Sequence, residues 1–82
     1  MNRDEKSFLT VSMLASIAAQ RMREQPGCRT TQSVEIDVTP FGWTLGFVTA
    51  KNSNPNDIAR GRIIVQRDMK HAYDLVLTRE AR

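Results

Sequence analysis

The chain has 82 residues, of which 40% are hydrophobic and 26% are charged, and its net charge is +3. This length allows a single domain over residues 1–82 with a modest core, and the composition excludes a wholly disordered chain. The charge excess is mild, so it does not by itself indicate a nucleic-acid-binding protein.

The cysteine content and the apolar runs predict where the protein is found. Cys28 is the single cysteine, so the chain forms no internal disulfide and nothing indicates an oxidising compartment. Its place beside Pro26 and Gly27 predicts a turn, in which a structural cysteine is expected rather than a reactive one. The longest apolar run, Phe8–Ala19, has 12 residues, whereas about 20 are needed to span a bilayer. We therefore expect a cytoplasmic protein with no membrane partner.

The first predicted element is a helix that starts after an N-cap at Asn2 or Asp4 and ends before Pro26. One set of apolar residues recurs in it every three or four positions: Phe8, Val11, Ala15, Ala18 and Met22. Others widen this stripe into a broad sector: Leu9, Met13, Leu14 and Ile17. A sector this wide predicts that one side covers a hairpin and another covers a second helix or a partner protein.

Residues Ser33–Ala50 predict one β-hairpin, because apolar and polar residues alternate on both sides of a turn at residues 39–42. We predict three cross-strand pairs, with all six side chains on one buried face: Val38 with Trp43, Ile36 with Leu45, and Val34 with Phe47. The other face is then exposed to solvent and carries Glu35, Asp37, Thr39, Thr44, Gly46 and Val48.

A second helix is predicted over Pro55–Tyr73, because Asn54 is a favourable N-cap and Pro55 suits the first helical position. An apolar stripe with helical spacing supports it: Ile58, Gly61, Val65, Met69, Ala72 and Val76. The β-branched residues 63–65 leave a strand over residues 61–67 as an alternative. An extended segment, with the option of a short third strand, is predicted near residues 74–78. The fold class is thus α+β, in the order helix–hairpin–helix.

The sequence carries no pattern typical of an enzyme. One histidine, His71, and one cysteine do not supply a zinc site, and the four glycines are too scattered for a phosphate-binding loop. Glu35 and Asp37 point the same way on their strand, but no third ligand accompanies them, so they predict a solvated face. We expect no catalytic residue, no metal and no cofactor.

The candidate site lies on the second predicted helix, where basic residues fall opposite the apolar stripe with an isoleucine among them. An isoleucine surrounded by charge is typical of an interaction surface. The candidate residues for partner or nucleic-acid binding are Arg60, Arg62, Ile63, Arg67 and Lys70.

These residues predict a non-enzymatic interaction module that binds a protein partner or forms a homodimer. Two hairpins could pair through their edges, with Glu35 or Thr44 near the two-fold axis, or the helices could pack through Met13, Ile17 or Ile63. The alternative is weak nucleic-acid binding by the basic residues of the second helix.

Overall fold

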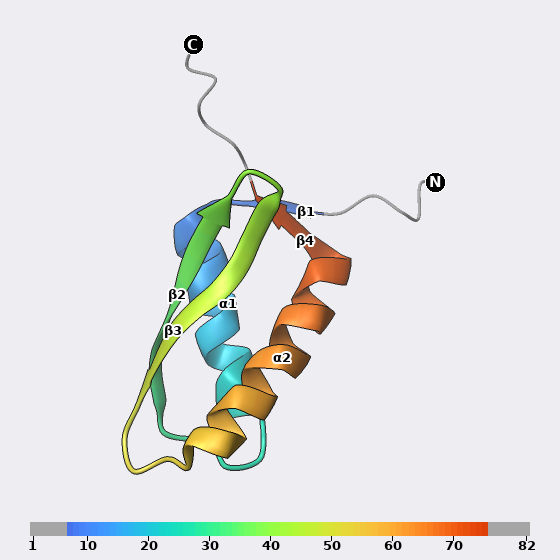
Figure 1. The fold of residues 1–82 in the computed structure, drawn as a ribbon. Coiled ribbons are helices and arrows are strands. Elements are labelled where there is room, and N and C mark those ends of the chain that lie inside the picture. Colours follow the sequence, from blue (N-terminus) through green and yellow to red (C-terminus); the bar gives the residue numbers. More distant parts are fainter. Residues whose placement is uncertain (1–6, 76–82) are drawn as a thin grey trace.

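A computed structural model describes residues 7–75 of the chain. The elements in order are β1 (Ser7–Leu9), α1 (Val11–Arg23), β2 (Thr31–Thr39), β3 (Gly42–Ala50), α2 (Pro55–Ala72) and β4 (Tyr73–Leu75). The hairpin β2–β3 lies in front of α1, and α2 lies beside β3 (Figure 1). The α+β class and the helix–hairpin–helix order are confirmed.

The hairpin register is confirmed at two of the three predicted pairs, Val38 with Trp43 and Ile36 with Leu45. The third pair is wrong, because Val34 lies opposite Val48 and not Phe47. Two residues of β2 span the same length as three residues of β3 here, so β3 contains a β-bulge at Gly46 and Phe47. The bulge turns Phe47 outward, where it is 67% exposed, and turns Val48 inward against the core.

The core forms between the inner face of the hairpin and the two helices. It contains, among others, Leu14, Ala18, Met22, Val34, Trp43, Leu45, Val65 and Met69. Trp43 is buried, with 1% of its surface exposed, as the hairpin pattern predicts. The expectation that all six alternating apolar side chains are buried is wrong for Phe47 and also for Val38, which is 55% exposed close to the hairpin turn.

Helix α1 begins later than the sequence predicts. Thr10 is its N-cap, and the Thr10 hydroxyl accepts a hydrogen bond from the Met13 N–H at 3.2 Å. Asn2 and Asp4, the predicted caps, lie outside the described residues. Phe8 and Leu9 belong to β1 rather than to the helix, because β1 pairs in parallel with β4.

Helix α2 confirms the predicted segment to within one residue, and residues 61–67 are helical rather than extended. The Asn54 side chain accepts a hydrogen bond from the Asn56 N–H at 2.8 Å, and Pro55 opens the helix. The predicted third strand exists as β4 at Tyr73–Leu75, and it pairs with β1 rather than with the hairpin. Residues 76–78 of that prediction lie outside the described residues. Among the helices described, none is long and apolar enough to cross a membrane.

Candidate functional site

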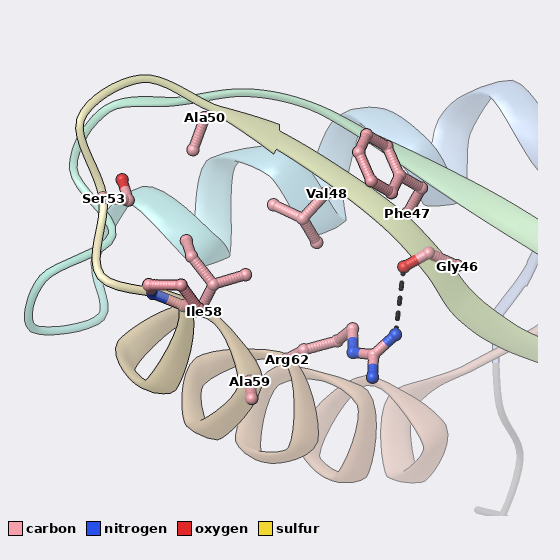
Figure 2. A pocket seen from close by; sticks show the side chains of 9 residues that line it. Gly46, Phe47, Val48, Ala50, Ser53, Ile58, Ala59 and Arg62 are labelled. Carbon is pink, nitrogen blue, oxygen red and sulfur yellow. Dashed lines mark hydrogen bonds between the residues drawn. The ribbon is translucent and has the colours of Figure 1, made fainter.

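Side chains of α2 hydrogen-bond to the open edge of β3. The Gln66 side-chain oxygen accepts a hydrogen bond from the Leu45 N–H at 3.0 Å. One turn earlier, the Arg62 guanidinium donates to the Gly46 carbonyl at 3.3 Å (Figure 2). Edge groups of a sheet need such partners when no further strand supplies them. Helix α2 therefore takes the place of a third strand at the middle of β3.

A pocket of about 330 Å³ opens between β3 and the first turns of α2. Apolar side chains, including Val48 and Ile58, line its inner part (Figure 2). Arg62 reaches across it to β3, while Phe47 points to the other side of the strand. The pocket is thus apolar inside and has one guanidinium at its side.

A second pocket, of about 480 Å³, continues along the same two elements on the other side of Arg62. It is lined by Thr44, Leu45, Arg62, Ile63, Gln66 and Arg67. Arg62 lies between the two pockets and lines both, and together they are here named the β3–α2 groove. Ile63 is 66% exposed at its rim, where it offers apolar surface to a ligand.

The five candidate residues from the sequence do not all lie together. Arg62, Ile63 and Arg67 line the groove. The Lys70 ammonium lies 4.7 Å from the centre of the Trp43 ring, close to the start of β3, and makes a cation–π contact there. Arg60 instead forms an ion pair with Asp57 near the start of α2, and it does not line either pocket.

The groove carries an excess of positive charge. Among the described residues, the ion pairs of α2 are those of Arg60 with Asp57 and of Arg67 with Asp68. The second is loose, with 3.7 Å between nitrogen and oxygen, and both side chains are more than half exposed. Such a pair contributes little. Arg67 is therefore available to a negatively charged ligand.

The outer face of the hairpin adjoins the groove and carries the opposite charge. Glu35 and Asp37 are both exposed on β2. Asp37 lies opposite Thr44, which itself lines the groove. The Asp37 carboxylate also lies against Gly46, within 3 Å of where a Cβ would stand. An acidic strip on β2 and a basic strip on α2 thus flank β3.

Two residues of this surface escape the sequence analysis. The sequence pattern assigns Phe47 to the buried face, because the alternation of apolar and polar residues does not reveal the change of side that the bulge causes. Gly46 is the available signal, since a glycine inside a strand often marks a bulge. Gln66 fits no motif, because its role as a hydrogen-bond acceptor depends on α2 lying beside β3.

Cys28 and His71 do not belong to the groove. The Cys28 thiol is fully buried and lies 3.4 Å from the Asp57 carbonyl oxygen. Burial, together with the Asp57 carboxylate, raises the pKa of Cys28. The thiol therefore stays protonated and unreactive at neutral pH. His71 is exposed, and the part of the chain from residue 7 to residue 75 has no cluster of three His, Cys, Asp or Glu side chains suited to a metal ion.

No family model, curated protein or solved structure matches this chain. Its function is therefore inferred from the groove and from the two charged strips beside it.

Proposed function

We propose that this protein is a non-enzymatic interaction module that binds a protein partner at the β3–α2 groove. The observation that carries the proposal is the exposure of two large apolar side chains, Phe47 and Ile63, on either side of β3. Charged residues border both of them, and an apolar patch with a charged rim is typical of a protein interface.

The groove favours a partner with acidic and apolar side chains. Arg62 and Arg67 line it and attract carboxylates, and arginine binds carboxylates well because its guanidinium presents paired donors. The apolar pocket between Val48 and Ile58 has room for an apolar side chain of the partner. A ligand that supplies both would bury Ile63 and neutralise the arginines together.

Weak nucleic-acid binding is the second candidate, and it is supported by the exposed cations of α2, Arg60, Arg62 and Arg67. The acidic strip weakens it, because Glu35 and Asp37 would repel phosphates that approach across β3. The two candidates differ in salt dependence, since each phosphate contact releases counterions and makes affinity fall steeply with salt.

The cytoplasmic location expected from the sequence also belongs to this proposal. It is supported by the free thiol of Cys28, the single cysteine of the chain.

A peptide titration followed by NMR tests the binding proposal. The probe is an extended peptide that alternates glutamate with leucine, and the control is the same peptide with lysine in place of glutamate. We expect the acidic peptide to shift the amide signals of Leu45, Gly46 and Ile63, and the basic peptide to leave them unchanged. A single-stranded oligonucleotide is titrated in parallel. Shifts caused by the oligonucleotide alone, lost at high salt, would contradict the protein partner and support nucleic-acid binding.

A further inference from the structure

We infer that the partner is a second copy of this chain, bound face to face about a two-fold axis that runs along β3 in the plane of the interface. In this arrangement the acidic strip of each copy covers the basic strip of the other. The inference rests on the proposed function, because it uses the same groove and names its occupant.

Acidic and basic side chains lie on opposite sides of this surface. Two copies that face one another about a two-fold axis can therefore bring unlike charges together. Acidic Glu35 and Asp37 lie on β2, β3 lies in the middle, and basic Arg62 and Arg67 lie on α2. Figure 1 views this surface, with β2, β3 and α2 side by side. When two copies face one another, a two-fold axis that lies in the interface along β3 reverses the order. It therefore places β2 of one copy over α2 of the other, twice.

The positions along the strands also match. Asp37 lies level with Thr44, and Glu35 lies level with the bulge at Gly46. On α2, Arg62 lies level with Gly46, to which it donates, and Arg67 lines the groove together with Thr44. An axis along β3 keeps these levels, so residues at the same level of the two copies face one another.

The rotation thus brings specific charges together. Glu35 of each copy meets Arg62 of the other, and Asp37 of each copy meets Arg67 of the other. Every contact occurs twice because the interface is isologous.

The apolar side chains follow the same symmetry. Phe47 lies on the β2 side of the β3 edge, and Ile63 lies on the α2 side. The rotation therefore brings Phe47 of one copy toward Ile63 of the other. These are two of the most exposed large apolar side chains in the described chain, at 67% and 66%. Their mutual burial supplies the hydrophobic centre that an interface needs, with the ion pairs around it.

Edge-to-edge pairing of two hairpins through β3 fits the structure less well. The Leu45 N–H and the Gly46 carbonyl are already bonded to α2. A second strand would have to displace both Gln66 and Arg62. Packing through the outer face of the hairpin and the groove does not require Gln66 or Arg62 to be displaced.

Charge reversal at one ion pair tests the inference. Asp37→Arg and Arg67→Glu are made separately, since both residues are exposed and neither makes a strong ion pair within its own chain. Sedimentation equilibrium measures the dimer dissociation constant. Each single variant places like charges opposite one another twice, so we expect its dissociation constant to rise about tenfold or more. Glu24→Arg and Arg29→Glu, at exposed positions outside this surface, are matched controls and leave the constant unchanged.

Mixing the two variants gives the most direct test of the charge pairing. In an equimolar mixture of Asp37→Arg and Arg67→Glu, each unlike pair of chains has opposite charges at both contacts. We therefore expect heterodimers at close to the wild-type affinity, and we expect the double variant to pair with itself again. Amide spectra verify that every variant is folded.

Three results would overturn the inference: a wild-type chain that is monomeric at every concentration, a dimer unaffected by either reversal, or a mixture that does not reassociate. None of these removes the proposed function. A monomeric chain that still binds the acidic peptide in its groove keeps that function and loses only the second copy as partner.

Discussion

The side-chain oxygen of Gln66 lies 3.0 Å from the main-chain nitrogen of Leu45 and accepts its hydrogen bond. This contact joins the second helix to the exposed edge of the hairpin. The bond is partly buried at the edge of the groove, so water replaces the lost acceptor only in part if Gln66 is changed. The contact therefore fixes the position of the groove as well as contributing to stability.

Replacing Gln66 by alanine leaves the Leu45 N–H without its acceptor. A fully buried donor without a partner costs about 1–3 kcal/mol; this one is partly buried, so we expect the free energy of unfolding to fall by about 1 kcal/mol. Urea denaturation measures it, and amide hydrogen exchange at Leu45 is expected to become faster. Gln66→Glu retains an acceptor oxygen and Gln20→Ala changes an exposed residue of α1, so both are expected to cost less. Equal losses in Gln66→Ala and Gln20→Ala would contradict this role.

Trp43 and Phe47 form a matched pair for testing the hairpin faces, because both are large and lie four residues apart on β3. Truncation of a buried large aromatic residue costs about 3–5 kcal/mol. Trp43→Ala is therefore expected to lose most of its amide signal dispersion, since small domains have little stability to spare. Phe47→Ala is expected to remain folded with a free energy of unfolding close to wild type. A folded Trp43→Ala, or an unfolded Phe47→Ala, would show that the faces are assigned wrongly.

The buried thiol of Cys28 predicts a pH dependence of stability. Burial raises the pKa of this thiol in the folded protein, so the folded chain holds the proton more tightly than the unfolded chain. The contribution of Cys28 protonation to the free energy of unfolding is fully present below the unfolded thiol pKa of about 8.5. It is lost as the pH rises from there through the folded pKa.

The comparison between wild type and Cys28→Ala isolates this effect from other groups that titrate at alkaline pH. We expect the free energy of unfolding of the wild type to fall more steeply above about pH 8.5 than that of the variant. Denaturation at a series of pH values measures both slopes. Parallel curves would mean that Cys28 has the same pKa in the folded and unfolded chains.

Local signals predict α2 and most of the hairpin, because the residues within each element determine its conformation. Asn54 and Pro55 mark a helix start wherever the helix packs, and the alternation around Trp43 requires a strand with one buried face. The bulge at Gly46 is harder to predict, since a single extra residue reverses every later side chain. The start of α1 does not follow from local signals, because Phe8 and Leu9 are held in β1 by pairing with β4, which is distant in the sequence.

The candidate site shows the same division. The basic residues of α2 and the isoleucine among them are visible in the helical pattern. Their relation to Glu35 and Asp37 is not, because it arises only when α2 lies beside β3 and the bulge exposes Phe47. The separation of Arg60 from the groove likewise depends on its contact with Asp57.

A dilution series of the ¹⁵N-labelled wild-type chain, followed by amide NMR spectra, tests the central claim most directly. If two copies pair through the β3–α2 groove and the acidic strip, dilution will shift the signals of Glu35, Thr44, Phe47, Ile63 and Arg67 together, with one dissociation constant. The signals of Met13 and Ile17 on α1 will stay in place. Spectra that do not change with concentration, or changes confined to α1, would contradict the claim.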